Sequence, residues 1–116
     1  MRRFFMNGYE WWIVRVHPYS HYLVDRTGAL TVATTDPTAL TIYISSALSG
    51  EFFTRVLIHE LGHATMFSYY LVDDIHSMVP PDKWIEAEEW TCNFLADYGQ
   101  NVFRIVHDLY FQGGRS

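Results

Sequence analysis

The hydrophobic pattern of this chain changes its period about half way along, and that change restricts the possible folds. Residues 40–45, Leu-Thr-Ile-Tyr-Ile-Ser, alternate apolar and polar side chains, which is typical of a strand with one buried face and one wet face. Ser49, Gly50 and Glu51 then offer a helix N-cap and a first-turn acid. From Phe52 to about Tyr70 the apolar residues recur at helical spacing. Strands followed by helices predict an α+β fold.

Two further strand regions precede the helix. Tyr9 to His17 is rich in aromatic and β-branched residues and stops at Pro18. Tyr22 to Asp25 and Ala29 to Thr35 are separated by Arg-Thr-Gly, which predicts a hairpin with Gly28 in its turn.

After the first helix we expect a loop from Val72 to Asp82, which contains Pro80-Pro81. A second helix is predicted from Lys83 to about Tyr110, bent or broken near Gly99. The expected architecture is therefore one compact domain over residues 1–116, with a small sheet of three or four strands followed by two helices.

Composition excludes several classes of protein. Apolar residues make up 49% of the 116 residues and charged residues 18%, as in a folded globular chain. The net charge is −5 and the Lys and Arg residues are scattered, which argues against direct binding to nucleic acid. No segment approaches the ~20 apolar residues of a membrane span, and Asn7, Gly8 and Glu10 interrupt the only stretch that resembles a signal peptide. A single cysteine, Cys92, fits a reducing compartment, so we expect a cytoplasmic protein.

The C-terminal residues resemble a protease site of the kind used in affinity tags. Residues 109–116 read Leu-Tyr-Phe-Gln-Gly-Gly-Arg-Ser, although His107 stands where such a site would have Glu. We interpret residues 107–116 as a flexible tail that is either native or a tag remnant, and no functional argument rests on it.

The first predicted helix contains His59-Glu60-Leu61-Gly62-His63. Residues four apart lie one turn apart on the same helix face, so His59 and His63 would present two imidazoles to one point, as a zinc ion requires. Glu60 lies beside the first histidine, where its carboxylate could reach a water molecule on that zinc and act as a general base and acid. Gly62 in mid-helix is costly relative to alanine and predicts close approach of another backbone.

A third zinc ligand is expected on the second helix. Steps of four and three residues along it give a stripe whose members are all apolar or small except Glu89: Ile85, Glu89, Cys92, Ala96, Gly99, Phe103 and Val106. A carboxylate on a buried stripe needs compensation, which a metal would supply. Glu89 is therefore the predicted ligand. Glu88, on the neighbouring stripe, is the alternative, and the loop residue His76 is a weaker one.

These residues resemble the gluzincin metallopeptidases, and in compact form the small zincins related to the ImmA/IrrE group, which are common in phages and mobile elements. The resemblance covers about residues 38–98, through Leu-Ile-His-Glu-Leu-Gly-His and the later segment Glu-Ala-Glu-Glu-Trp-Thr-Cys-Asn-Phe-Leu-Ala-Asp. It implies a zincin-like domain in which an edge strand beside the active-site helix holds an extended peptide. That strand would be Thr41, Ile42, Tyr43, Ile44 and Ser45.

The resemblance also implies residues around the metal. Gluzincins usually have Asp four residues after the third ligand, where this chain has Asn93, whose amide oxygen could still accept from a zinc-bound imidazole. They often add a His or Tyr that stabilises the oxyanion. His76, Tyr69 and Tyr98 are the candidates, and spacing does not choose among them.

Two functions follow from this sequence. The first is a zinc-dependent metallopeptidase that hydrolyses a peptide or protein substrate, acting in the cytoplasm of a bacterial host if the gene belongs to a phage. The alternative is a phage-encoded binding or anti-defence protein that keeps the zincin scaffold and acts by contact without proteolysis. The presence of Glu60 favours the enzyme, because a scaffold that only binds has no need of a general base.

Overall fold

The computed structural model describes residues 1–111 and has the predicted α+β architecture. Four strands form one mixed sheet: β1 (Arg2–Met6), β2 (Tyr9–Val16), β3 (Ala33–Asp36) and β4 (Thr41–Ser45). Their order in the sheet is β1-β2-β4-β3. The pairs β1–β2 and β3–β4 are antiparallel, whereas β2 and β4 are parallel.

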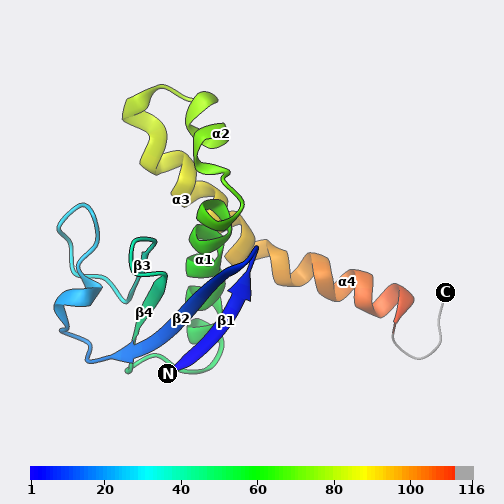
Figure 1. Cartoon of the computed structure of the whole chain (residues 1–116). Helices are drawn as coiled ribbons and strands as arrows, with labels where there is room; N and C mark the ends of the chain where they lie inside the picture. The colour runs from blue at the N-terminus through cyan, green and yellow to red at the C-terminus, as the bar shows by residue number, and fades with distance from the viewer. Residues whose placement is uncertain (112–116) are drawn as a thin grey trace.

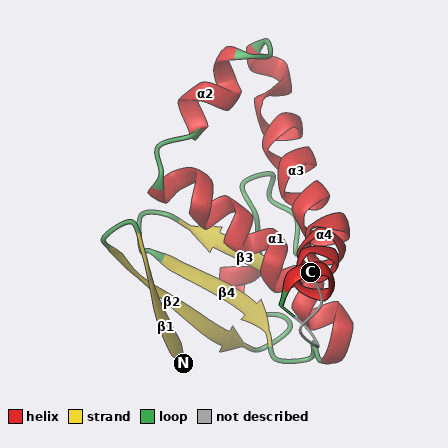
Figure 2. Ribbon diagram, turned by 90° about the vertical axis from the view of Figure 1, so that its right-hand side faces the viewer, coloured by secondary structure: helices red, strands yellow, loops and turns green. Residues whose placement is uncertain are grey.

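The helices follow the sheet in the sequence. They are α1 (Gly50–Ser68), α2 (Val72–Ser77), α3 (Trp84–Phe94) and α4 (Gln100–Tyr110), and a π-helical turn at Leu95–Gly99 joins the last two. α1 lies across one face of the sheet, and α3 runs beside α1 (Figures 1 and 2). α4 projects away from this body (Figure 1). Within residues 1–111, no helix combines the length and apolar character needed to cross a membrane.

The core lies between the sheet and α1. Trp11, Ile42 and Ala64 are fully buried and form one cluster, to which strand and helix both contribute. The Trp11 indole Nε1 donates a hydrogen bond to Ser68 Oγ at 2.9 Å, so the polar atom of this buried ring is satisfied. A second cluster of Ala33, Ile44 and Val56 fixes the other end of α1 against β3 and β4. The helix that bears both histidines is therefore held rigidly on the sheet.

The observed elements differ from the expected ones in three places. No strand was expected at the N-terminus, yet Arg2–Met6 pairs with β2 through a tight turn at Asn7 and Gly8, whose φ angles are both positive, 48° and 84°. The hairpin expected around Gly28 is reduced to one bridge between Val24 and Leu30.

The chain around Gly28 does not pair further for a local reason. Asp25 Oδ1 accepts hydrogen bonds from the Thr27 and Ala29 amides at 2.8 and 3.1 Å, which closes a compact loop in place of a ladder. In the region predicted as a loop, Val72–Ser77 forms α2 and Pro81–Lys83 a 3₁₀ turn.

The second helix bends where the sequence predicted it. The π-helical turn ends at Gly99, where an added Cβ would lie 2.9 Å from Leu95 Cδ1.

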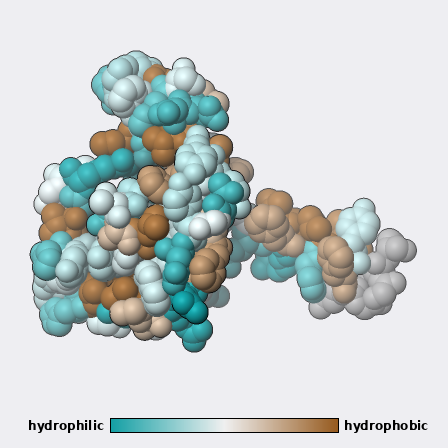
Figure 3. All heavy atoms as spheres, viewed as in Figure 1, coloured by the Kyte–Doolittle hydropathy of each residue, from teal (hydrophilic) through white to brown (hydrophobic). Residues whose placement is uncertain are grey.

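Residues 107–110, expected to form part of a flexible tail, belong to α4, and residues 112–116 lie outside the described residues. α4 buries none of its residues, and Figure 3 shows hydrophobic side chains along its surface.

Candidate metal centre

His59 and His63 lie one turn apart on α1, as their spacing predicted. Both side chains are largely buried, with 16% and 15% of their surface exposed, and the ring centroids are 5.1 Å apart. Both histidines line a cavity of about 930 Å³ between the sheet side and the helices. The two imidazoles are therefore held on a rigid helix but face an open space.

Glu89 of α3 bridges the two histidines. Its Oε2 lies 2.9 Å from His59 Nε2, and its Oε1 lies 3.1 Å from His63 Nε2. Because these contacts favour the ionised carboxylate, the pKa of Glu89 lies far below its usual value. The structure thus brings together the two histidines and the glutamate that the sequence analysis selected, from two different helices.

The burial argument that selected Glu89 is nevertheless wrong in detail. The Glu89 side chain is 40% exposed, whereas the side chain of its neighbour Glu88 is only 8% exposed. The phase of α3 differs slightly from the stripe assumed in the sequence analysis: Cys92, Ala96 and Gly99 are buried as expected, but Glu88 shares their side of the helix. Glu89 lies at the edge of this buried face and is directed into the cavity.

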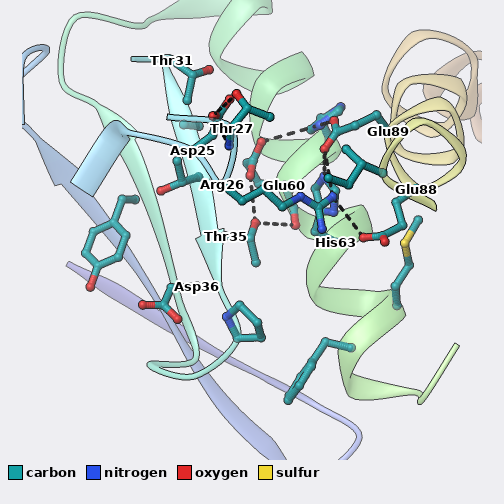
Figure 4. Close-up of a pocket in the computed structure, with 18 of the residues that line it drawn as sticks. Asp25, Arg26, Thr27, Thr31, Thr35, Asp36, Glu60, His63, Glu88 and Glu89 are labelled. Carbon is teal, nitrogen blue, oxygen red and sulfur yellow. Dashed lines mark hydrogen bonds and ion pairs between the residues drawn. The ribbon is translucent and has the colours of Figure 1, made fainter. Parts of the chain in front are cut away.

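Glu60 is almost fully buried, with 7% of its surface exposed. Its Oε1 accepts a hydrogen bond from Thr35 Oγ1 of β3 at 2.8 Å, and its Oε2 lies 3.8 Å from His59 Nε2 (Figure 4). Burial raises the pKa of Glu60, and the opposing effects of Thr35 and the two histidines do not cancel this shift. A carboxyl with a raised pKa beside two imidazoles is suited to receive and release a proton.

Asn93, which the resemblance places beside a metal-bound imidazole, is one of the residues that act on the pKa of His59. Burial acts to lower the pKa of His59, but its contacts with Glu89, Glu60 and the Asn93 side chain outweigh burial and raise it. Asn93 lies one turn beyond Glu89 on α3, so one helix supplies both the carboxylate and the amide that face His59. A partner of this kind fixes the orientation of an imidazole that binds metal.

A second donor set includes Cys92 in place of Glu89. Ligand atoms of His59, His63 and Cys92 lie within 4.8 Å of one another. However, Cys92 is fully buried, its Sγ packs against the α1 backbone at Gly62, and burial raises the pKa of its thiol to about 12. Cys92 does not line the cavity, whereas Glu89 does. We favour Glu89 over Cys92 as the third ligand, because the Glu89 carboxylate is ionised whereas the Cys92 thiol is protonated, and because Glu89 faces the cavity.

One of the three oxyanion candidates lines the cavity. His76 does so, whereas Tyr69 and Tyr98 are not among the lining residues and are 49% and 61% exposed. His76 Nε2 lies 2.7 Å from Glu88 Oε2. The structure therefore leaves His76 as the candidate and gives Glu88 a separate role as its partner.

Arg26 is a cavity residue that the sequence analysis missed. It reaches from the loop before β3 toward α3, where its Nη2 lies 3.1 Å from Glu88 Oε1 and 3.6 Å from Glu89 Oε1 (Figure 4). No spacing rule links residue 26 to residues 88 and 89, because the contact depends on how the loop folds over the cavity.

The strand predicted to hold substrate is not an edge strand. β4 is paired with β2 on one side and β3 on the other, so Thr41–Ser45 has no free backbone edge to which a peptide could add. Its Thr41 and Ser45, expected to face water, are buried at 7% and 3% exposure. Only Tyr43 is partly open, and the ring of Tyr22 stacks on it at 4.4 Å. The edge strand on the side of the cavity is β3, whose Thr35 contacts Glu60.

Comparison of the chain with protein-family models, with curated proteins and with solved structures finds no match.

Proposed function

We propose that this protein is a zinc-dependent metallopeptidase with His59, His63 and Glu89 as metal ligands and Glu60 as general base and acid. The observation that carries the proposal is the convergence of two imidazole Nε2 atoms and one carboxylate from two different helices. The resemblance to the gluzincins and the ImmA/IrrE group points the same way.

The donor set fits a zinc ion. Imidazole nitrogen and carboxylate oxygen are ordinary zinc ligands, and atoms about 2.0–2.1 Å from a tetrahedral zinc lie about 3.3 Å from one another. The two Nε2–Oε distances, 2.9 and 3.1 Å, each involve a different oxygen of Glu89 and are hydrogen-bond distances, so the carboxylate would move outward for one of its oxygens to bind the ion. Three protein ligands facing a cavity are typical of a catalytic centre that keeps one position for water.

Zinc bound there would supply a Lewis acid that lowers the pKa of a water molecule and polarises a substrate carbonyl. Glu60 then receives the proton of the attacking water and delivers it to the leaving amine. Thr35 orients the Glu60 carboxylate for this transfer, and the raised pKa of Glu60 makes its carboxylate a stronger base toward the proton of the water. The water oxygen forms a bond to the carbonyl carbon and the C–N bond breaks, so the products are a carboxylic acid and an amine that carries the delivered proton.

The substrate would lie along β3 rather than β4. β3 has a free edge, and an extended peptide could pair with it through backbone hydrogen bonds. Because Thr35 of β3 contacts Glu60, a peptide on this edge would place its carbonyl near the proposed base. His76 and Arg26 line the same cavity and could face the developing negative charge.

The proposal is tested by metal content and peptidase activity measured together. Wild-type protein loaded with zinc should bind one equivalent and cleave members of a mixed peptide library, with products read by mass spectrometry. Glu60→Gln should retain the zinc and lose ~100-fold or more of the activity, since it removes the base but no ligand. A wild-type protein that holds zinc and cleaves no peptide would contradict the enzymatic proposal.

A binding function on the same scaffold is the second candidate. It is favoured by the large apolar side chains that α3 and α4 leave exposed, among them Trp90, Phe94 and Phe103 at 67%, 50% and 67%. The two candidates differ in their response to Glu60→Gln. A protein that acts by contact keeps its effect on the cells that express it, whereas a peptidase loses it.

A further inference from the structure

We infer that Arg26 is a positioning residue for the metal centre: it holds the Glu89 carboxylate in the orientation in which Glu89 binds the ion. The inference rests on the proposed zinc site. Arg26 lies in the loop before β3, outside both the histidine motif on α1 and the helix α3 that bears Glu89. The inference therefore gives this loop a function.

Arg26 reaches the centre from the opposite side of the cavity. Its Nη2 lies 3.6 Å from Glu89 Oε1, the same oxygen that faces His63 Nε2 at 3.1 Å. Glu89 Oε1 is therefore held between an imidazole and a guanidinium, while Oε2 faces His59. With both oxygens directed in this way, the rotation of the carboxylate about its last bond is restricted.

Glu88 fixes the position of Arg26. Its Oε1 accepts from Arg26 Nη2 at 3.1 Å, and its Oε2 pairs with His76 Nε2 at 2.7 Å. Glu88 is buried, so the guanidinium is anchored by a carboxylate that cannot itself move into solvent. The His76 ring in turn stacks on Trp84, with centroids 4.3 Å apart.

The charges around the centre require such a cation. Glu60, Glu88 and Glu89 all line the cavity, and Arg26 is the only Lys or Arg among the described residues that do so. Without it, the neighbouring carboxylates of Glu88 and Glu89 would repel each other, and Glu89 could turn outward, since its side chain is 40% exposed. Arg26 is itself about half exposed, so we assign it an orienting role rather than a large share of stability.

The loop keeps its shape independently of Arg26. Asp25 Oδ1 caps the Thr27 and Ala29 amides, and Val24 bridges to Leu30. Substitution of Arg26 should therefore remove the contact with α3 and leave the loop folded.

The test is zinc affinity, measured by competition with a chromophoric chelator. Arg26→Gln should weaken zinc binding by ~10–100-fold, the usual cost of losing a partner of a metal ligand. Arg26→Lys should recover only part of this loss, because an ammonium keeps the charge but is a strongly hydrated point charge on a flexible stem, without the planar geometry of the guanidinium. Arg55→Gln is the matched control: Arg55 is an equally exposed arginine on α1 that pairs with Asp97 and does not line the cavity. It should leave zinc affinity unchanged.

A second readout separates positioning from general destabilisation. In cobalt-substituted protein, Arg26→Gln should change the visible absorption spectrum of the metal, whereas the melting temperature of the metal-free variant should match that of the wild type. If the wild type binds zinc and the Arg26→Gln variant binds it equally tightly, the inference about Arg26 is wrong and the proposed function is unaffected. A wild type that binds no zinc would overturn the proposed function and this inference with it.

Discussion

At the scale of single residues, Glu88 and Glu89 show how one step along a helix separates two functions. Consecutive residues are about 100° apart around the axis. Glu88 is therefore turned toward Arg26 and His76, where both of its oxygens are paired, while Glu89 is turned toward His59 and His63. The carboxylate of Glu88 therefore holds Arg26 and His76 in place, whereas the carboxylate of Glu89 is a proposed metal ligand.

Substitution of the candidate donors one at a time should identify the third ligand. We expect Glu89→Gln to weaken zinc binding by more than ~100-fold, beyond the 10–100-fold typical of changes outside the ligand shell. Cys92→Ala should have little effect, because the thiol is buried and its pKa is raised to about 12. Chelator competition on both variants gives the answer. If the losses were reversed, the centre would be the His59, His63 and Cys92 set.

The helix spacing of the two histidines could be predicted from sequence because it depends only on the 3.6-residue period. Glu89 was selected by the same period, although its burial was not as expected, since an error of a few tens of degrees in helix phase exchanges Glu88 and Glu89. Arg26 could not be found in this way. Its contact joins residues 62 positions apart through an irregular loop, and no local pattern encodes such a contact.

At the scale of the elements, strands and helices with clear periodicity were predicted well. β2, β4, α1 and the bent α3–α4 helix lie close to their expected ranges. The arrangement of strands was not accessible, because the parallel pairing of β2 and β4 leaves β3 at the edge. Nothing in the alternation of Thr41–Ser45 distinguishes a central strand from an edge strand, so the wrong strand was expected to hold the peptide.

The packing of α1 on α3 depends on a residue without a side chain. A Cβ on Gly62 would lie 3.0 Å from Cys92 Sγ, 3.4 Å from its Cβ and 3.5 Å from its Cα. This close approach explains why a mid-helix glycine is present, as the sequence predicted. It also sets the distance between the histidine pair and Glu89.

Gly62→Ala should therefore destabilise the protein despite better helix propensity. Overpacking of a core costs about 1–3 kcal/mol, and alanine returns ~1 kcal/mol of helix propensity. We expect a net loss of about 1 kcal/mol in urea unfolding of the metal-free protein. The loss should be smaller in a Cys92→Ala background, where the Sγ contact is gone. Equal losses in both backgrounds would show that the Gly62–Cys92 contact is not limiting.

At the scale of the whole molecule, the chain consists of a packed body and one helix that leaves it. The body holds the sheet, α1 and the cavity, whereas α4 buries no residue and extends outward (Figure 1). Its apolar residues occupy one side of the helix, at 45–67% exposure: Val102, Phe103, Ile105, Val106, Leu109 and Tyr110. The proposed metal centre does not depend on this helix, because its ligands lie on α1 and α3.

Hydrogen exchange should reveal this division. An isolated helix of about 11 residues is marginal in water, and α4 buries none of its residues against the rest of the protein. At low protein concentration, amides of 102–110 should exchange at least ~100-fold faster than those of 60–68 in α1, which pack against the sheet. Mass spectrometry of deuterated peptides measures the difference. Comparable protection of α4 that disappears on tenfold dilution would show that another copy covers its apolar side, whereas protection that persists on dilution would contradict the projecting arrangement of α4.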